Sequence, residues 1–356
     1  MLAPVVSAAV LSVRQGLAEC RLCNNSRGGR FVQVPPILRR LGALTILSVL
    51  CGVLCCRKPV APLVAVIPET TAQELWESEH AGVALAARQY GWNIYWNAPS
   101  REGDVQRQIQ IVNAVRLRKP TGVILSPIDA FALIYPVQTL LAAGIPVVVT
   151  GSQLGIAPAG GLSFVLNDEQ ETGKLIAEHL APELKPGDTV AILGVNSAIL
   201  ALADRARAIR NALLQRAPDI QVIERKGELS GFEQPEESAE ETIRSIPHLK
   251  VIIGLDIQQT RAAHFALVHT GMSGSIILIG CEQDLDLVRL LRAGKIDSIV
   301  AINSASMGAI ALENIARYRE GKSFPRVTAT SPVLITRENV DTSEMQKILN
   351  MDWSIR

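Results

Sequence analysis

Polar side chains follow nearly every short apolar run in this 356-residue chain. Open parallel sheets bind ligands at the carboxyl ends of their strands, so these residues are the first candidates for chemistry. They include few charges and no nucleophile paired with a base, a composition that favours recognition by hydrogen bonds over bond-making. The set comprises residues 69–76, 126–129, 150–153, 167, 196–197, 256–258, 282–284 and 303–304.

Motifs typical of nucleotide chemistry or metal binding are missing from the sequence. No GxGxxG occurs, and the Gly-Lys-Ser at 321–323 lacks the first glycine of a P-loop, which would stand at Ala316. The closest histidines, His264 and His269, are five residues apart and misaligned on a helix. The CxxC at 20–23 has no second pair at metal-site spacing. We therefore expect neither an enzyme nor a bound metal or cofactor.

The elements that would position the polar residues are strands and helices in regular alternation. The apolar runs have the composition of parallel strands that are buried on both faces. We predict strands at 63–68, 93–98, 122–127, 145–151, 162–167, 189–194, 220–225, 250–256, 275–282 and 298–303. We predict amphipathic helices at 74–90, 104–117, 132–143, 169–180, 201–216, 235–245, 258–270, 285–293 and 307–320. Strict alternation implies right-handed βαβ units and parallel sheets. This many units exceeds one compact sheet, so we predict two lobes.

Residues 1–58 differ in composition from the rest of the chain. Eight basic residues and one acidic residue give them a net charge of +7, whereas the remainder carries −6. A basic leader on an acidic body argues against nucleic-acid binding and for a targeting segment. The uncharged run at 41–56 is short for a bilayer span of about 20 residues and near the length of a signal-peptide core. We expect export or membrane anchoring, with lipidation of a cysteine at 51–56 as the weaker alternative.

Six stretches of the body carry a family pattern in their order and spacing. They are VAVIPETTAQELWESEHAGV, GVILSPIDAFAL, AGIPVVVTGSQ, LNDEQETGKLIAEHLA, ILIGCEQD and LRAGKIDSIVAINSASMGAIALENI. Together, over about residues 63–336, they resemble the type I periplasmic binding proteins, the ribose-binding-protein-like class of sugar receptors. The resemblance implies an α/β fold of two doubly wound parallel-sheet lobes joined by a three-crossing hinge, with crossings near Asn167, Asn303 and Pro332.

The resemblance also implies where each part of the chain belongs. Residues 1–58 would form the basic leader with its hydrophobic signal or anchor segment. The N-terminal lobe would comprise residues 59–167 plus 303–332. The C-terminal lobe would comprise residues 168–302 plus 333–356.

Binding residues of the first lobe are implied where the family pattern aligns. The first ligand loop of the family offers an asparagine and aromatic rings, and Gln73, Leu75 and Trp76 stand there. The loop after IPVVVT usually carries an Asp-Arg pair that grips a sugar. Here that loop has a glycine followed by Ser152 and Gln153, which is the main departure from the family.

Binding residues of the second lobe and the hinge are implied in the same way. The family arginine at the start of the first helix of that lobe matches Arg205, its asparagine matches Asp256, and its next aspartate matches Glu282. The polar residue at the second crossing falls at Asn303 or at Ile302. The two negative charges of Asp256 and Glu282 leave a cationic or amine-bearing ligand open.

Each of three candidates also has a purely structural interpretation. Trp76 fits the apolar stripe of its helix and would pack in the core. Arg205 would lie on the surface of an arginine-rich helix. Asp256 would cap the helix that begins near residue 258.

The function that the resemblance implies is capture of a small polar ligand, a sugar, for an ABC-type importer in the cell envelope. Such a receptor would be periplasmic or anchored to the outer face of the cytoplasmic membrane. Its partner would be an ABC permease, or a sensor kinase if the chain is instead the ligand-binding domain of a signalling system. A lactose-repressor-type effector domain is a weaker alternative, because the leader offers an apolar run where a helix-turn-helix would be needed. We expect no nucleic-acid partner.

Overall fold

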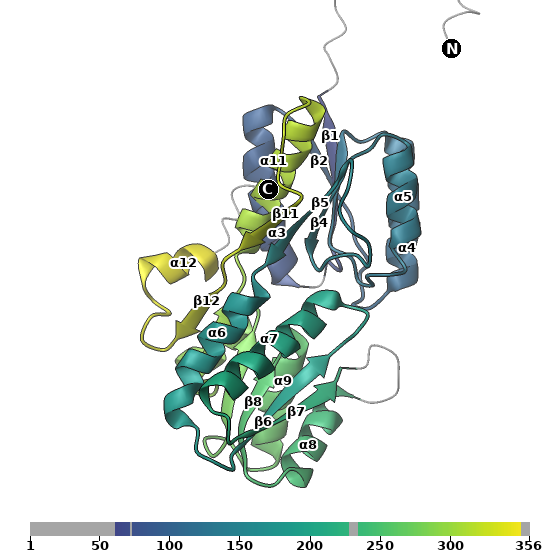
Figure 1. Cartoon of the computed structure of the whole chain (residues 1–356). Helices are drawn as coiled ribbons and strands as arrows, with labels where there is room; N and C mark the ends of the chain where they lie inside the picture. Colours follow the sequence, from purple (N-terminus) through teal and green to yellow (C-terminus); the bar gives the residue numbers. More distant parts are fainter. Residues whose placement is uncertain (1–60, 72, 228–233, 350–356) are drawn as a thin grey trace, which may run out of the picture. The chain divides into compact units, whose positions relative to one another are not determined.

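Two six-stranded sheets, each covered by helices, make up the part of the chain that the computed structural model describes, residues 61–71, 73–227 and 234–349 (Figure 1). The first sheet has the strand order β11-β5-β4-β3-β1-β2 and the second β12-β10-β9-β8-β6-β7. Neighbouring strands are parallel except for the antiparallel pair of β10 with β12. We call each sheet with its helices a lobe.

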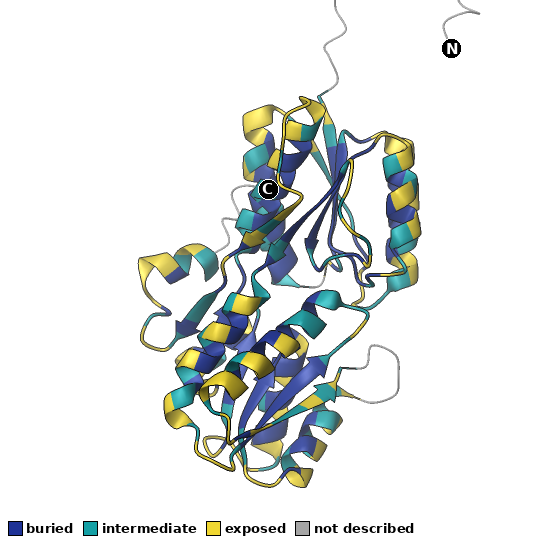
Figure 2. Ribbon diagram, viewed as in Figure 1, coloured by how far each residue is buried: buried dark blue, intermediate teal, exposed yellow. Residues whose placement is uncertain are grey.

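The strands form from the apolar runs, and the predicted α/β class is confirmed. Their bounds are β1 Leu63–Ile67, β2 Asn93–Trp96, β3 Gly122–Leu125, β4 Val147–Gly151, β5 Leu162–Asn167, β6 Thr189–Val195, β7 Gln221–Lys226, β8 Leu249–Gly254, β9 Ile277–Cys281, β10 Ser298–Ala301, β11 Val327–Thr330 and β12 Val333–Thr336. Central strands such as β3 are buried along their whole length, as expected for strands with helices on both faces (Figure 2).

The last two strands were not predicted. β11 and β12 are four residues each and lie at sheet edges, where only some of their residues are buried. β11, with the sequence VTAT, has no apolar run, and the apolar run of β12, VLI, is shorter than the roughly four residues by which a strand is recognised.

The predicted helices form with ends shifted by at most three residues. Their bounds are α3 Glu74–Tyr90, α4 Val105–Val115, α5 Ile134–Ala142, α6 Glu169–Leu180, α7 Leu200–Arg216, α8 Pro235–Ser245, α9 Ile257–His269, α10 Leu285–Arg292 and α11 Ser304–Arg319, followed by the unpredicted α12 Ser343–Leu349. Short 3₁₀ turns follow α4 and α6. Gly91 ends α3 in the left-handed conformation, with φ of 66°, as expected for a helix C-terminus.

Two pairs of helices approach so closely that a side chain would not fit between them. A Cβ at Gly82 of α3 would lie 1.9 Å from the carbonyl oxygen of Ala305 in α11. A Cβ at Gly173 of α6 would lie 2.5 Å from the backbone of Ala208 in α7. These contacts are one or two turns from residues described below as lining a cavity, so they fix the helices that carry those residues.

The chain passes between the lobes three times. The first passage follows β5 at Asn167, the second lies between β10 and α11, and the third joins β11 to β12 at residues 331–332. The backbone N–H of Asp168 donates to the carbonyl of Thr330 at 2.9 Å, so the first and third passages lie side by side. The predicted three crossings are therefore present. The strands of each sheet fall within the residue ranges predicted for its lobe, while the lobe boundaries themselves stay a prediction.

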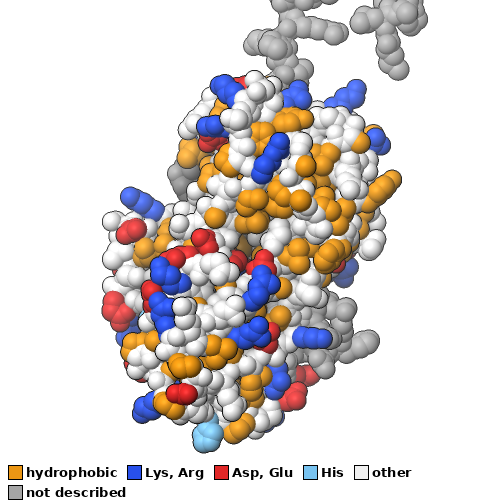
Figure 3. Space-filling model, viewed as in Figure 1, with side chains coloured by type: hydrophobic (Ala, Val, Ile, Leu, Met, Phe, Trp, Pro, Cys, Tyr) orange, Lys and Arg blue, Asp and Glu red, His pale blue; other side chains and the backbone are white. Residues whose placement is uncertain are grey.

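The charged surface carries no single-sign patch on the face shown in Figure 3, where acidic and basic side chains are interspersed. This face shows no basic stripe of the kind that a nucleic-acid binder carries. Among the described residues, no helix combines the length and the apolar character that a membrane crossing requires. The predicted leader, including the apolar run at 41–56, lies outside the described residues.

Candidate functional site

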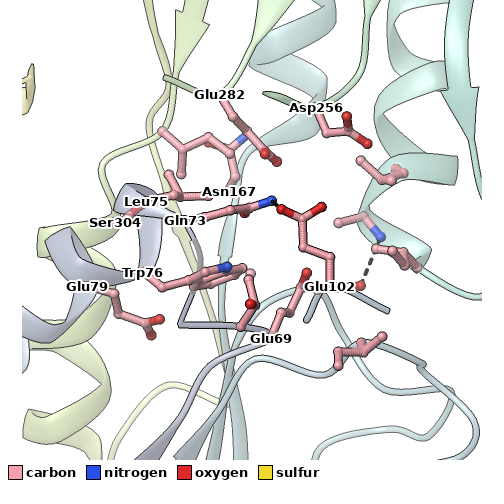
Figure 4. A pocket seen from close by; sticks show the side chains of 18 of the residues that line it. Glu69, Gln73, Leu75, Trp76, Glu79, Glu102, Asn167, Asp256, Glu282 and Ser304 are labelled. Atoms are coloured by element: carbon pink, nitrogen blue, oxygen red, sulfur yellow. Dashed lines mark hydrogen bonds between the residues drawn. The ribbon is translucent and has the colours of Figure 1, made fainter. Parts of the chain in front are cut away.

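A cavity of about 100 Å³ lies between the lobes, where the carboxyl ends of both sheets meet. A cavity of this size can hold several waters or one small molecule. Figure 4 shows side chains from both lobes pointing into this space. The lining residues are Glu69, Thr70, Gln73, Leu75, Trp76, Glu79, Glu102, Gly103, Ile128, Gly151, Ser152, Asn167, Ile199, Ala201, Leu202, Arg205, Asp256, Gln258, Glu282, Ile302, Ser304 and Met307.

Trp76 is the largest side chain that lines the cavity. It lies in the first turn of α3, and its side chain is buried against the hydrophobic core while still lining the cavity. Both interpretations of this residue, core packing and exposure to a ligand, therefore describe the same side chain. Its indole Nε1–H is buried without a hydrogen-bond partner among the described residues, so a bound molecule that accepts a hydrogen bond would satisfy it.

Arg205 is buried at the back of the cavity. Its guanidinium donates to both carboxylate oxygens of Glu169, at 2.9 and 3.0 Å, to Glu282 at 3.0 Å and to the carbonyl of Leu255. Because only 3% of its side chain is exposed, the interpretation as a surface residue is wrong. Burial by itself lowers the pKa of Arg205, but the two carboxylates raise it well above its usual value.

The hydrogen bonds of Arg205 leave little of it for a ligand. They use four of its five N–H groups, and the planar edge that matches a carboxylate is occupied by Glu169. The resemblance implied that the guanidinium of Arg205 donates to a ligand. In the structure the guanidinium instead joins α7 to α6 through Glu169. Glu169 begins α6, where Asp168 caps the helix, and the close approach of α6 to α7 brings it to Arg205.

Glu282 and Asp256 enter the cavity from the second lobe (Figure 4). Glu282 follows β9 with a φ of 67°, a left-handed conformation that is uncommon outside glycine and that often marks a functional position. Burial raises its pKa to about 7, against the opposing effect of Arg205. Asp256 caps α9 by accepting the backbone N–H of Gln259 at 2.7 Å, and burial raises its pKa to about 6. The helix-cap interpretation of Asp256 is therefore correct, and the residue also lines the cavity, while its contact with a ligand stays a prediction.

Three further carboxylates line the cavity from the first lobe. Glu69 follows β1, and burial followed by the charges of the other acidic residues, Glu282 first, raises its pKa well above the usual value. Glu79 lies on α3, where burial raises its pKa to about 7, and Ser126 donates a hydrogen bond to it at 3.2 Å. Glu102, in the loop after β2, accepts a hydrogen bond from Gln73 at 3.0 Å.

Hydrogen bonds join the lobes beside the cavity. Ser152 accepts the backbone N–H of Ala201 at 3.1 Å, and Gln153 donates to Asp204 at 2.7 Å. The lobes are therefore in contact around the cavity, as in a closed receptor. The amide oxygen of Asn167, at the first passage between the lobes, is buried with no partner among the described residues and lines the same space.

Most of the residues predicted from the sequence line this cavity, and two do not. Those that line it are Gln73, Leu75, Trp76, Ser152, Arg205, Asp256 and Glu282. Asn303 instead caps α11 by accepting the backbone N–H of Ser306 at 3.1 Å, because it directly precedes the helix, and Ile302 lines the cavity in its place. Gln153 turns away to Asp204.

The sequence held a signal for some of the missed residues. Glu69 and Thr70 fall in the polar stretch after the first strand, and Asn167 ends another strand. Glu79 is a carboxylate at a position of α3 that faces the core, which is an unusual place for an acidic residue. Glu102 lies six residues beyond its strand in an irregular loop, and no spacing rule indicates it.

Comparison with known proteins places the chain among binding proteins. The family model of the periplasmic binding protein domain matches residues 64–323. The D-ribose/D-allose-binding protein of Pseudomonas aeruginosa is 22% identical over 271 residues, which cover 74% of this chain and 84% of the relative. The D-allose-binding periplasmic protein of Escherichia coli is 22% identical over 268 residues, covering 73% and 86%.

Solved structures share the fold at low sequence identity. A carbohydrate transporter solute binding protein from Agrobacterium radiobacter, in complex with D-arabinose, has a TM-score of 0.74 and 19% identity, covering 82% of this chain and all of its own. A periplasmic solute binding protein from Actinobacillus succinogenes, with bound D-allose, has a TM-score of 0.69 and 22% identity, covering 78% and 98%. Since the family model spans most of the described residues, this chain belongs to the periplasmic binding protein domain family, a family of binding proteins and not of enzymes.

Proposed function

We propose that this chain is the extracytoplasmic receptor of an ABC-type importer and captures a small sugar-like molecule between its lobes. The observation that carries the proposal is the interlobe cavity, which combines the flat indole of Trp76 with acceptor groups from both sheets. Aromatic faces stack on the C–H faces of sugars while polar groups bond the hydroxyls. The relatives named for ribose and allose, and the similar structures with arabinose and allose, support this ligand class.

In this proposal, both lobes contribute side chains that contact the ligand. Trp76, Leu75 and Gln73 would form the wall that comes from α3, and Ser152 the adjoining loop. Asp256 and Glu282 would accept hydroxyl protons from the opposite side. Arg205 would hold Glu282 in place and offer its remaining N–H.

Closure of the lobes would convert binding into a signal for a membrane permease. The three passages between the sheets are the natural pivot, because few residues need to change their backbone angles there. Only the closed form brings the two sets of side chains around one ligand, so ligand binding shifts the population toward it. The basic leader at 1–58 would target the receptor to the cell envelope or anchor it there.

Titration with sugars tests the proposal. D-allose, D-ribose, D-arabinose, D-fucose and D-tagatose are titrated into the purified full-length chain, with calorimetry and tryptophan fluorescence as readouts. We expect at least one sugar to bind with a micromolar Kd, about −8 kcal/mol. Trp76→Phe should weaken binding and remove most of the fluorescence change, whereas Trp92→Phe, outside the cavity, should do neither. The absence of binding at millimolar concentration of every sugar and amino sugar tested would remove the proposal.

A further inference from the structure

The lining of the cavity is strongly acidic. Five carboxyl groups reach it, from two lobes and five separate segments: Glu69, Glu79, Glu102, Asp256 and Glu282. Arg205 is the single Lys or Arg among the described lining residues, and Glu169 behind it already balances its charge. Figure 4 shows Glu282 and Asp256 approaching from one side and Glu69 and Glu102 from the other. The cavity therefore holds acidic groups without cations to match them.

The lining of the cavity also offers more hydrogen-bond acceptors than donors. An ionised carboxylate only accepts hydrogen bonds. Several donors are engaged: Gln73 uses one N–H on Glu102, and Asn167 uses one on Thr172 at 2.9 Å. Arg205 retains one N–H, and the indole N–H of Trp76 has no partner among the described residues. Neutral hydroxyls need donors as well as acceptors, whereas an ammonium group has three donors and no acceptor. A ligand rich in donors therefore fits this lining better than a neutral one does.

Trp76 adds a second feature that favours a cation. Its indole lines the cavity on the same helix turn as Glu79, which lies three residues further along α3. Cations bind over the faces of aromatic rings, and tryptophan is the best of them. The buried Oε1 of Glu79 has no hydrogen-bond partner among the described residues. An aromatic face beside a carboxylate with one unpartnered oxygen is suited to an amine.

We infer that the ligand is a polyhydroxylated molecule that carries a protonated amine, such as an aminodeoxy sugar, and that the carboxylates around Glu69 bind the amine. The inference rests on the proposed function and narrows its ligand class.

Ion pairing in this cavity must be linked to proton release. Burial, with the mutual repulsion of the acidic groups, raises the pKa of Glu69 well above the usual value, and burial brings that of Glu282 to about 7. These groups face Glu79, Glu102 and Asp256, with Arg205 and Glu169 behind Glu282. At neutral pH Glu282 is partly protonated in the empty cavity, and a bound cation would ionise it. A neutral sugar would bind without releasing protons.

Matched pairs of ligands test the inference on the full-length chain. D-glucose, D-galactose and D-allose are compared by calorimetry at pH 7.5 with their 2-amino-, 3-amino- and 6-amino-deoxy forms. We expect at least one amine to bind tenfold or more tightly than its neutral parent. Repeating the titration in two buffers of different ionisation enthalpy measures proton release. We expect roughly a quarter of a proton or more per amine bound, because a group with a pKa near 7 is about one-quarter protonated at pH 7.5.

A charge-neutral variant locates the amine. Glu69→Gln keeps the shape of the side chain and should reduce the preference for the amine over its parent at least fivefold. Glu313→Gln, on the exposed side of α11 and paired with Arg317, should leave the preference unchanged. If Glu69→Gln fails to fold, the proton release of the native chain still tests the inference, because an amine that binds without releasing protons would overturn it.

The outcomes separate the inference from the function on which it rests. If a neutral sugar binds as tightly as each of its amine forms, or if the amine binds without proton release, the inference is overturned while the receptor function stands. If Glu69→Gln folds and keeps the full preference, the assignment of the amine to these carboxylates is overturned. If no ligand of either kind binds, both are overturned.

Discussion

Trp76 occupies the space that a side chain at residue 151 would need. The backbone of Gly151 has a φ of 71°, and a Cβ built on it would lie 3.1 Å from Cη2 of the Trp76 indole. The related family pattern has an aspartate in this loop, and the sequence alone shows only its loss. In the structure the indole of Trp76, which comes from α3, lies against this glycine.

Replacing Gly151 with alanine tests this packing of Trp76 on Gly151. The left-handed backbone angle strains any L-residue, and the added methyl pushes on the indole. We expect Gly151→Ala to lower the free energy of unfolding by about 1–3 kcal/mol and to weaken ligand binding about tenfold or more. Urea unfolding and calorimetry measure the two effects.

Gly160→Ala is the matched control for this substitution. Gly160 also has a positive φ, 58°, but no atom lies within 4 Å of an added Cβ. It should lose stability through the same backbone strain and keep its affinity. Equal losses of affinity in the two variants would show that Trp76 is not displaced.

Removing Arg205 should destabilise the fold. Arg205→Met leaves Glu169 and Glu282 buried without their cation, and breaking a buried pair in this way typically costs about 3–5 kcal/mol. Arg210→Met, on the exposed face of the same helix, breaks only a surface pair with Glu224 and should cost less than about 1 kcal/mol. Urea unfolding of both variants at pH 7 measures the difference, and similar losses would contradict a structural role for Arg205.

The stability of the chain should fall as the pH rises from about 4.5 to 7. Glu79 is buried, and its pKa is raised from 4.5 to about 7, so the folded state binds more protons than the unfolded state across this window. For one isolated group such a shift corresponds to about 3 kcal/mol, present below the lower pKa and lost above the higher one. Glu79→Gln should therefore flatten the profile of unfolding free energy against pH.

Urea unfolding between pH 4 and pH 8 gives that profile. Glu313→Gln is the control, since Glu313 is exposed and away from the cavity. A Glu79→Gln profile as steep as that of the native chain would mean that Glu79 does not carry the effect.

Contact between Gln153 and Asp204 should strengthen ligand binding by stabilising the closed form. Their hydrogen bond of 2.7 Å spans the two lobes and can exist only when the lobes are together. In a double-mutant cycle of Gln153→Ala and Asp204→Ala, the coupling in ligand affinity should be about 0.5–1.5 kcal/mol. Calorimetry of the four proteins measures it, and additive effects would argue against this bond as a closure contact.

Local sequence patterns determined the order of the elements and the edge of the sheets at which the site lies. Ten apolar runs became ten strands, because residues buried on both faces of a sheet must be apolar whatever their neighbours are. Helix ends were equally local, as the cap at Asp256 illustrates. Strand ends also put Trp76, Asp256 and Glu282 among the candidate residues, and the family resemblance implied that they belong to one site.

Tertiary structure alone decided what each side chain does in the cavity. The sequence does not show that Glu169 accepts hydrogen bonds from the guanidinium of Arg205. The two residues are 36 positions apart and meet only because α6 and α7 pack closely. Nor does it show that Glu69, Glu79 and Glu102 join Asp256 and Glu282. Charge balance in a cavity depends on which distant segments converge there, and only the folded chain fixes that convergence.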